Sequence, residues 1–234
     1  MLGIFLDILF PSRCAACGAT VASADRRLCP SCAGRIDVLE EGCPFCSGPA
    51  GKSPCPSCAD RHWYITRHIA LSDYSGVMKS AIRKMKFGGI RGIYSALGSL
   101  AAREIVRRSI SADIITWVPM NSKKEWRRGF NQSERISSFI SKKTGIPGRA
   151  LLREKRGAGA QRDLGLRDRF IHSLGRYEPV KGPNLSGKSV LLVDDVYTTG
   201  ATINECARQL RMAGAEQVFS LTIARTDVKR LEKF

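Results

Sequence analysis

The chain has 234 residues, of which 43% are hydrophobic and 25% are charged, an ordinary composition for one large or two modest globular domains. No apolar stretch approaches the length that spans a bilayer, and the apolar segment Met1–Phe10 lacks a basic start and a small-residue cleavage site. The composition therefore argues against a membrane span and a signal peptide, and it predicts a cytoplasmic protein with a core of its own.

The formal net charge of +17 is unevenly distributed. Residues 1–62 carry six basic and six acidic side chains, so the whole excess lies in residues 63–234. Between Met120 and Arg169 there are fourteen Lys and Arg against five acids, which favours binding to a polyanion such as nucleic acid. A solvated, solubilising face explains the same charge equally well.

The first 13 residues predict a short helix packed on the body, followed by a cysteine-rich head. Eight of the nine cysteines form four C-x-x-C pairs: Cys14/Cys17, Cys29/Cys32, Cys43/Cys46 and Cys55/Cys58. A C-x-x-C turn presents two thiolates to one ion, and two such turns complete the four-sulfur shell that zinc favours. Few large apolar residues lie here, so metal is expected to supply the folding free energy that a core cannot. We therefore predict two structural zinc ions in an N-terminal domain of residues 1–62, and expect strong chelation to unfold residues 14–58 while leaving the body largely folded.

The simplest assignment is sequential, with the first four cysteines on one ion and the last four on the other. An interleaved arrangement satisfies the same spacing. Disulfides are the main structural alternative, disfavoured because the chain shows no export signal, and no βαβ unit surrounds these turns to suggest a thioredoxin-like redox pair.

The start of the basic body predicts a strand and two helices. Residues His68–Tyr74 predict a strand, and Gly76–Lys86 and Ile90–Arg107 predict helices separated by Phe87-Gly88-Gly89. The helical spacing of apolar residues in the second helix predicts a buried face.

A second strand is predicted at Asp113–Val118, followed by a basic loop, Pro119–Gly129. Asn131 is a plausible N-cap, with Glu134 as its capping-box partner, for a helix ending near Gly145. The polar, basic segment Gly145–Ser173 then predicts a mobile lid.

Residues Gly182–Ser189 satisfy the nucleotide-binding P-loop expression G-x-x-x-x-G-K-[ST]. A true P-loop follows a strand and opens a helix, whereas Ser189 leads directly into the apolar run Val190–Val193. The backbone amides could not converge on phosphates at a helix N-terminus, so we reject a P-loop here.

The stretch Val190–Thr202 carries the strongest sign of a functional site. An apolar β-branched run ends in Asp194 and Asp195, and the small hydroxylated loop Thr198–Thr202 opens an amphipathic helix. The helix N-terminus offers unpaired amides and a positive dipole end to a phosphate, and Gly200 allows close backbone approach. Two acids beside a phosphate cradle must face something else, and vicinal ribose hydroxyls fit. The pattern predicts a site for a phosphorylated ribose.

The chain then continues as a helix, Ile203–Ala213, and a parallel strand, Val218–Ala224, with Gly214 as the helix stop. Cys206, the ninth cysteine, shares an apolar helix face with Ile203 and Leu210 and is predicted to be core.

The run of four apolar residues, two acids, Val, any residue and Thr-Thr-Gly-Ala-Thr resembles the phosphoribosyl pyrophosphate (PRPP) motif of type I phosphoribosyltransferases. Over nearly its whole length the chain resembles the ComF (competence protein F) family. Arg-Gly-Phe-Asn-Gln at Arg128–Gln132 and the Lys86-Phe87-Gly88 ending match that family's pattern. The resemblance implies an α/β fold with a Rossmann-like parallel sheet flanked by helices, behind a double zinc ribbon.

The resemblance also implies roles for individual residues. Asp194 and Asp195 would hold the ribose 2′ and 3′ hydroxyls of Mg²⁺-bound PRPP, and also serve as the catalytic pair. The 5′-phosphate would be bound by Thr198, Thr199, Gly200, Ala201 and Thr202. The pyrophosphate would be bound by Lys123, Lys124 and Arg127. Lys86 would either reach the pyrophosphate as well or, as an exposed lysine at a helix end, only satisfy the helix dipole. Gln161, Leu164 and Arg169 are placed as in the family's flexible segment, whereas His172 stands where relatives commonly have asparagine.

Three hypotheses about function follow. The first is a PRPP-binding phosphoribosyltransferase linked by resemblance to DNA uptake in natural transformation. The second is a single-stranded DNA-binding protein whose transferase site is regulatory or vestigial, with competence or recombination proteins as possible partners. Trp63, Trp117 and Trp126 could stack on bases, although Trp117 lies in a predicted strand and is expected to be core. The third is a structural zinc protein with neither activity.

Overall fold

The computed structural model describes residues 12–21, 27–49, 51, 53–87, 92–155, 174–182 and 184–226. The predicted helix in the first 13 residues lies almost wholly outside these ranges, as do Gln161, Leu164, Arg169 and His172 of the predicted lid. Within the described part of the chain, no helix is both long and apolar enough to span a bilayer.

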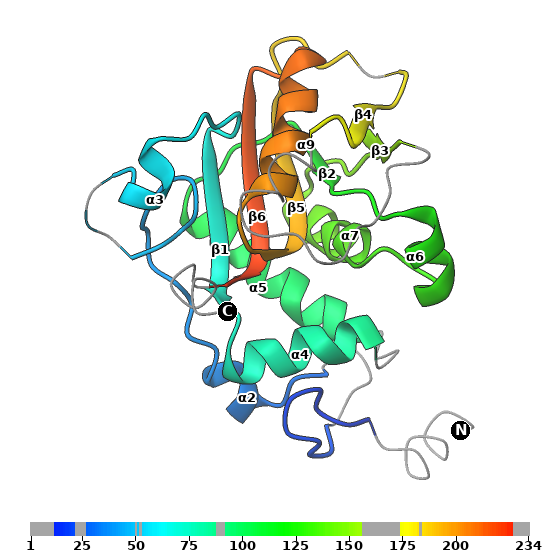
Figure 1. Cartoon of the computed structure of the whole chain (residues 1–234). Helices are drawn as coiled ribbons and strands as arrows, with labels where there is room; N and C mark the ends of the chain where they lie inside the picture. Colours follow the sequence, from blue (N-terminus) through cyan, green and yellow to red (C-terminus); the bar gives the residue numbers. More distant parts are fainter. Residues whose placement is uncertain are drawn as a thin grey trace.

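A parallel four-stranded sheet forms the centre of the molecule, in the order β1-β6-β5-β2 (Figure 1). Its strands are β1 (Arg67–Asp73), β2 (Ile114–Trp117), β5 (Ser189–Tyr197) and β6 (Gln217–Arg225). Val193 of β5 pairs with Trp117 on one side and Leu221 on the other. The apolar run of β5 is fully buried, as expected for a parallel strand covered on both faces.

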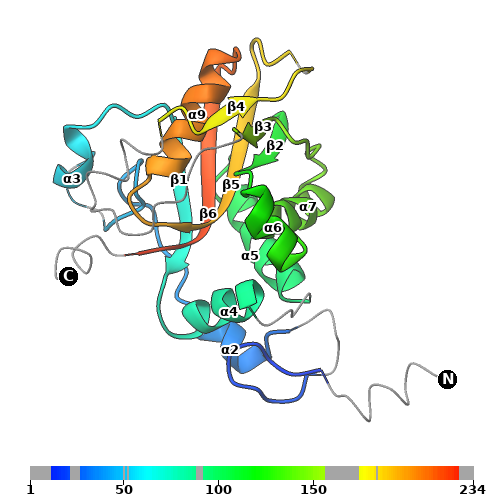
Figure 2. The same cartoon turned by 45° about the vertical axis from the view of Figure 1, so that its right-hand side comes forward.

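Helices cover the two faces of the sheet separately (Figures 1 and 2). Helices α5 (Ile93–Arg107) and α7 (Gln132–Thr144) pack on one face, and α9 (Ala201–Met212) lies on the other. In α9 the buried residues Ile203, Cys206, Ala207 and Leu210 recur at helical spacing, which directs one apolar stripe toward the sheet. Cys206 is therefore core, as predicted.

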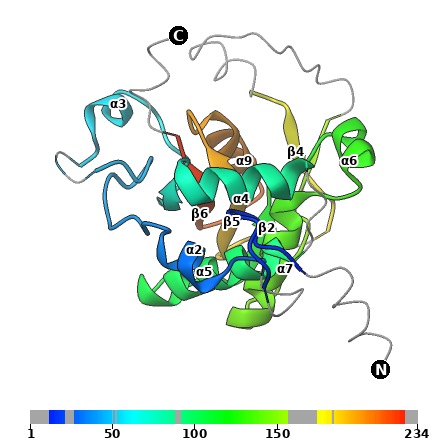
Figure 3. The ribbon, with the colours of Figure 1, turned by 90° about the horizontal axis from the view of Figure 1, so that it is seen from below.

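Helix α4 (Gly76–Phe87) crosses the edge at which the parallel strands end, as the view from below shows (Figure 3). On the side of α9, a short antiparallel pair, β3 (Leu152–Glu154) and β4 (Tyr177–Pro179), forms a separate two-stranded sheet. The predicted lid thus contains a strand, β3, within its first part.

The predicted loop Pro119–Gly129 is instead a helix, α6 (Ser122–Arg128). The Asn121 side chain caps it by accepting a hydrogen bond from the Lys123 amide, and Gly129 ends it in the left-handed conformation, with φ of 77°. Both signals are present in the sequence, but the density of basic residues favoured the interpretation as a loop. The next helix, α7, begins as predicted, with the Asn131 side chain accepting from the Ser133 and Glu134 amides.

The cysteine-rich segment forms two modules that lie apart on the body. The first zinc module, residues 12–36, carries α2 (Pro30–Gly34) and lies beside α4, whereas the second, residues 43–58, carries α3 (Pro56–Ala59) (Figures 1 and 2). Each module contributes buried residues to a hydrophobic cluster that also contains sheet and helix residues of the body. The domain boundary between residues 62 and 63 stays a prediction. Because each module shares a hydrophobic cluster with the body, its folding is expected to depend on the body.

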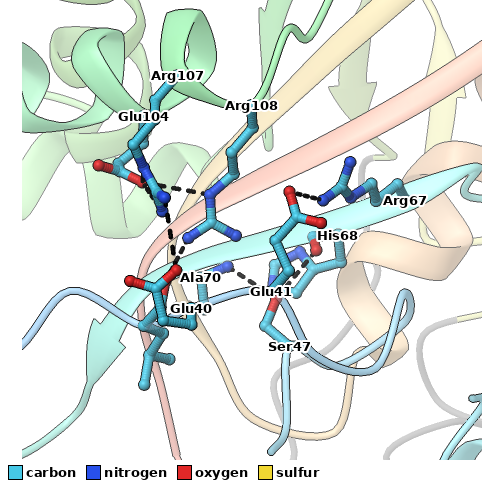
Figure 4. Close-up of polar contacts among 10 residues, drawn as sticks. Glu40, Glu41, Ser47, Arg67, His68, Ala70, Glu104, Arg107 and Arg108 are labelled. Atoms are coloured by element: carbon cyan, nitrogen blue, oxygen red, sulfur yellow. Dashed lines mark hydrogen bonds and ion pairs between the residues drawn. The ribbon is translucent and has the colours of Figure 1, made fainter. Parts of the chain in front are cut away.

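A linker, residues 37–42, joins the modules, and with Pro44 and Ser47 it covers the free edge of β1 (Figure 4). The Leu39 amide donates to the Leu71 carbonyl at 2.9 Å, and the His68 amide donates to the Pro44 carbonyl at 2.7 Å. Ser47 Oγ donates to the His68 carbonyl and accepts from the Ala70 amide, both at 2.9 Å. An edge strand with unpaired backbone groups invites aberrant pairing, and these contacts close it.

Candidate functional site

The eight C-x-x-C cysteines form two clusters of four thiols in sequential order. Cys14, Cys17, Cys29 and Cys32 make one cluster and Cys43, Cys46, Cys55 and Cys58 the other, with the sulfur atoms of each cluster within 4.8 Å of one another. All nine cysteines are free thiols, so the sequential assignment is confirmed over disulfides and over interleaved ligation.

The spacing of the sulfur atoms fits zinc. The Cys17 and Cys29 sulfurs are 3.8 Å apart, and those of Cys46 and Cys55 are 3.7 Å apart. A tetrahedron with Zn–S bonds of about 2.3 Å places its sulfurs about 3.8 Å apart. Both clusters are thus structural zinc sites with four cysteine ligands, and closed four-ligand shells of this kind serve folding rather than catalysis.

Asp194 and Asp195 lie inside β5, not after it, because the strand continues to Tyr197. Asp194 Oδ1 accepts hydrogen bonds from the Ser133 hydroxyl at 2.9 Å and from the Asp195 amide at 2.8 Å. The Lys86 ammonium, at the end of α4, lies 2.9 Å and 2.8 Å from the two carboxylate oxygens of Asp195. The acidic pair therefore sits where β5, α4 and α7 meet.

The electrostatics of the pair are unequal. Burial raises the pKa of Asp194, and the neighbouring charge of Asp195 raises it further, to about 7. Hydrogen bonds from the Asp195 amide and Ser133, and the charge of Lys86, oppose this rise. A carboxyl group near half-ionisation at neutral pH beside an ion-paired carboxylate is the arrangement expected of a functional site.

The loop after the acidic pair leads directly into α9. Gly200 caps the helix in the left-handed conformation, with φ of 79° and ψ of −2°, and its carbonyl accepts the first helical bond from the Asn204 amide at 2.8 Å. A Cβ on Gly200 would lie 2.3 Å from the Tyr197 hydroxyl oxygen and 2.8 Å from Trp63 Cη2, so only glycine fits. Thr198–Gly200 thus precede the helix, and Ala201 and Thr202 are its first residues, with a helix N-terminus next to the acidic pair.

The basic residues predicted to hold pyrophosphate are not gathered at one point. Lys86 contacts the acidic pair, whereas Lys123 and Arg127 are exposed on α6, and the Lys124 side chain lies outside the described part. Within the residues that the structure describes, no hydrogen bond or ion pair joins Lys123 or Arg127 to Asp194 or Asp195. Arg128 instead lies over the Phe87 ring, 5.3 Å from its centroid, at the end of α4.

Residues missed from the sequence also shape the site. Ser133 orients Asp194, Trp63 packs against Gly200 from the side of the second zinc module, and Asn204 in the first turn of α9 bonds the backbone of His62 and Tyr64. Ser133 lies in the first turn of α7. The sequence predicts the start of this helix from its N-cap, but it does not indicate that Ser133 contacts Asp194.

The segment Gly182–Ser189, which matches the P-loop expression, leads into a strand and not into a helix, as predicted. Leu185 is buried, Gly187 has a φ of 68°, and Ser189 begins β5. Strand, not helix, follows the motif.

Known proteins match the chain in two parts and as a whole. Residues 5–61 match the double zinc ribbon domain, and residues 152–233 match the phosphoribosyl transferase domain. The chain is 31% identical to the DNA utilization protein YhgH of Escherichia coli K12 over 228 residues, covering 92% of this chain and 98% of that protein. It is 27% identical to Competence protein F of Haemophilus influenzae over 229 residues, with the same coverage of both chains.

A solved structure of the glutamine PRPP amidotransferase from B. subtilis aligns with 56% of this chain and 26% of its own, at 26% identity and a TM-score of 0.38. The sheet order, the double zinc ribbon match and the full-length relatives agree with the resemblance carried by the PRPP motif. The chain belongs to the ComF (competence protein F) family, with a double zinc ribbon joined to a type I phosphoribosyltransferase fold.

Proposed function

We propose that the chain binds PRPP, as its magnesium complex, at the carboxyl edge of β5. One observation carries the proposal. Over Asp194–Ala201 the acidic pair is followed by a glycine in the left-handed conformation, and this glycine is followed by the N-terminus of α9. Amides at a helix start favour a phosphate, and neighbouring carboxylates accept from hydroxyls, so one ligand with both groups is required. A ribose 5-phosphate unit has both groups.

Each side chain of the site then has a role. Thr198, Thr199, Gly200, Ala201 and Thr202 would surround the 5′-phosphate, and Asp194 and Asp195 would accept from the 2′ and 3′ hydroxyls. Lys86, now paired with Asp195, would exchange part of that contact for the ligand's pyrophosphate. Its contact with Asp195, and the contact of Arg128 of α6 with the adjacent Phe87, support this role.

Phosphoribosyl transfer at this site would rely on positioning and charge. The bond between C1′ and the pyrophosphate oxygen breaks, its electron pair leaves with pyrophosphate, and the acceptor supplies a new pair to C1′. Asp194 and Asp195 would hold the ribose during this step, while Lys86, Lys123, Lys124 and Arg127 would stabilise the charge on the leaving group.

Thermal unfolding and calorimetric titration test the binding. A ligand that binds only the folded state stabilises it by about 2.7 kcal/mol at one hundred times its Kd, so magnesium PRPP should raise the melting temperature of the parent. The double variant Asp194→Asn with Asp195→Asn should show no such rise. Asp37→Asn, which changes an exposed acid in the linker, is the matched control and should respond like the parent. An equal rise in the double variant would show that the ribose assignment is wrong.

A second candidate function, binding of single-stranded DNA, is favoured by a basic and aromatic surface on α6 and the end of α4. Trp126 is 86% exposed on α6, among Lys123 and Arg127, and Phe87 is 76% exposed beneath Arg128. Exposed aromatic rings among cations are the elements that stack bases and contact phosphates. Relatives named for DNA utilization and competence are consistent with this function.

Fluorescence anisotropy with a labelled oligothymidylate tests this second function. Log affinity should fall linearly with log salt, with about −0.7 in slope for each neutralised phosphate. Trp126→Ala should weaken binding by about 1–3 kcal/mol if the ring stacks on a base. Met212→Ala removes a comparably exposed side chain from α9 and should change nothing. Binding that is absent at low salt would leave the basic charge as a solvated face.

A further inference from the structure

The segment Arg61–Tyr64 connects the second zinc module to the loop before α9. The Trp63 indole N–H donates to the carbonyl of Cys58, a zinc ligand, at 3.1 Å. Its ring stacks on Phe45, with centroids 5.4 Å apart and planes 8° apart, and Phe45 lies between the ligands Cys43 and Cys46. The second zinc module therefore holds the Trp63 ring in place by a hydrogen bond to its N–H edge and by stacking on its face.

The opposite edge of Trp63 touches the loop. A Cβ on Gly200 would lie 2.8 Å from Trp63 Cη2, so the ring is packed directly against the glycine that begins α9. Tyr197, the last residue of β5, is packed against the same glycine. The left-handed turn at Gly200 is thus held between a strand end and a ring whose position the zinc module sets.

A second set of contacts ties the same segment to α9. The buried side chain of Asn204 accepts from the Tyr64 amide at 2.8 Å and donates to the His62 carbonyl at 2.9 Å. The Arg61 guanidinium donates to the Thr199 carbonyl at 3.5 Å. An asparagine whose amide bonds two backbone groups of one segment holds that segment in register with the helix.

We propose that Trp63 and Asn204 are positioning residues for the 5′-phosphate, through which zinc at the second module preorganises the loop Thr198–Ala201. The inference rests on the proposed PRPP site and adds a coupling to it. If zinc and the 5′-phosphate stabilise one arrangement of this loop, each must strengthen the binding of the other by the same factor. The first zinc module packs on α4 and lacks these contacts within the described residues, so it should be coupled less.

Zinc release to a zinc-selective chromogenic chelator measures the coupling. Two release phases are expected, and Cys17→Ser and Cys55→Ser, which each impair one site, assign them to the first and second modules. Saturating magnesium PRPP should slow release from the second module, by about 5-fold where the lower end of the usual coupling in affinity is expressed in the dissociation rate. Release from the first module should change less than about 2-fold. Equal slowing of both phases, or none of the second, would overturn the proposal.

Variants of the two residues identify the path of the coupling. Trp63→Leu and Asn204→Ala should retain two zinc ions per chain, bind PRPP about 5-fold more weakly or worse, and lose the selective slowing of zinc release. Asn204→Asp keeps the acceptor for the Tyr64 amide and should restore part of the affinity. Val106→Ala, at an exposed position of α5 outside both proposed binding surfaces, is the control and should leave both readouts unchanged.

PRPP binding by the parent protein distinguishes a failure of the proposed function from a failure of the coupling. If calorimetry shows that the parent does not bind PRPP, the proposed function is wrong and the coupling falls with it. If the parent binds PRPP but Trp63→Leu, with both zinc ions retained, binds equally well, only the coupling is wrong.

Discussion

The two zinc modules share a ligand pattern but meet the body in different ways. The first contributes Cys14, Cys32 and Ile36 to a cluster that also contains Met78 and Ile82 of α4. The second contacts β1 and the β5–α9 loop through specific hydrogen bonds and ring contacts, such as those of Ser47 and Trp63. The first module packs against α4 through apolar contacts, whereas the second positions the loop before α9 through hydrogen bonds and ring contacts.

The difference places one module behind each half of the candidate site. Helix α4, beside the first module, ends in Lys86, which contacts Asp195. The loop beside the second module contains Gly200 and leads into the N-terminus of α9. The same metal-binding motif can therefore serve two purposes in one molecule, because the residues around each module make different contacts with the body.

Complete removal of zinc should have the largest effect on both modules. Structural zinc contributes about 10–16 kcal/mol of apparent binding free energy to small zinc domains, which matches or exceeds the about 5–15 kcal/mol by which a typical domain is stable. Because both modules complete clusters of the body, we now expect chelation to destabilise the sheet as well, unlike the expectation drawn from the sequence. Hydrogen exchange at β5 and β6 amides after chelation measures this effect.

The single-site variants sharpen the same prediction. Cys17→Ser should chiefly increase exchange in α4, and Cys55→Ser should chiefly increase it in β1 and the first turn of α9. If β5 and β6 remain as protected without zinc as with it, the modules fold independently and the expectation drawn from the sequence stands.

Glu104 anchors the linker between the modules and is the next most sensitive position. Its buried carboxylate accepts from Arg107 Nε at 2.9 Å and Arg108 Nε at 3.2 Å, and buried Arg108 donates in turn to the Leu39 carbonyl (Figure 4). Burial raises the pKa of Glu104, but the hydrogen bonds from the two arginines outweigh burial and hold it below the ordinary value. Glu104→Ala leaves Arg108 buried without its partner and should reduce the free energy of unfolding by about 3–5 kcal/mol.

Urea unfolding with matched variants checks this prediction. Glu104→Gln keeps the volume and one acceptor, so it should be less destabilising. Arg107→Ala removes a more exposed partner, whose ion pair is screened by solvent, and should destabilise the protein much less than Glu104→Ala does. A loss for Glu104→Ala no greater than that for Arg107→Ala would show that the linker is not anchored here.

The second module's contact with β1 should respond to a single hydroxyl. Ser47→Ala leaves the Ala70 amide and the His68 carbonyl without the Ser47 Oγ partner and should cost about 1–3 kcal/mol. Ser47 has a φ of 53°, a region that favours glycine. Ser47→Gly should therefore be less harmful than Ser47→Ala in the same urea measurement, and the reverse order would mean that backbone strain is unimportant at this position.

Features set by neighbours in the chain could be predicted from the sequence. The C-x-x-C pairs define the two zinc clusters, and apolar runs, capping residues and helical spacing predict β1, β5, α7 and α9 within a few residues. Helix α6 could not be separated from a loop, because seven residues with four basic side chains have no apolar stripe to mark a helix. The strand β5 runs past the acidic pair because pairing with β6 continues to Tyr197, which no local pattern indicates.

The candidate site divides in the same way. Asp194, Asp195 and the loop that follows lie in one stretch and were predicted from it. Ser133 lies 61 residues before the acid it contacts, Lys86 lies 109 residues before its partner, and the Asn204 contacts span 140 and 142 residues. Contacts at such separations depend on the whole topology, so their residues are visible only once the strands are ordered.

Asp194 provides a test that depends on pH, and it addresses the half of the site beside α4. Its pKa of about 7 lies above the ordinary value of 3.8, so between about pH 4 and 7 the folded state holds a proton that the unfolded state has released. The stabilisation from this proton is complete below about pH 4 and is lost as pH rises through about 7. Asp194→Asn should remove this loss, so the variant should gain stability relative to the parent as pH rises from about 4 to 7.

The positive charge of Lys86 lowers the pKa of Asp194, so Lys86→Met should raise that pKa and extend the loss of stability to higher pH. Urea unfolding across pH 4 to 8, with zinc in excess and each profile subtracted from that of the parent, isolates the contribution of this one carboxyl group. Trp63→Leu lies beside the other half of the site and should leave the shape of the pH profile unchanged. A change equal to that of Lys86→Met would show that the two halves are not supported separately. A ring fixed by the second zinc module would then act on a carboxyl group whose pKa is set by burial and by Asp195, Ser133 and Lys86.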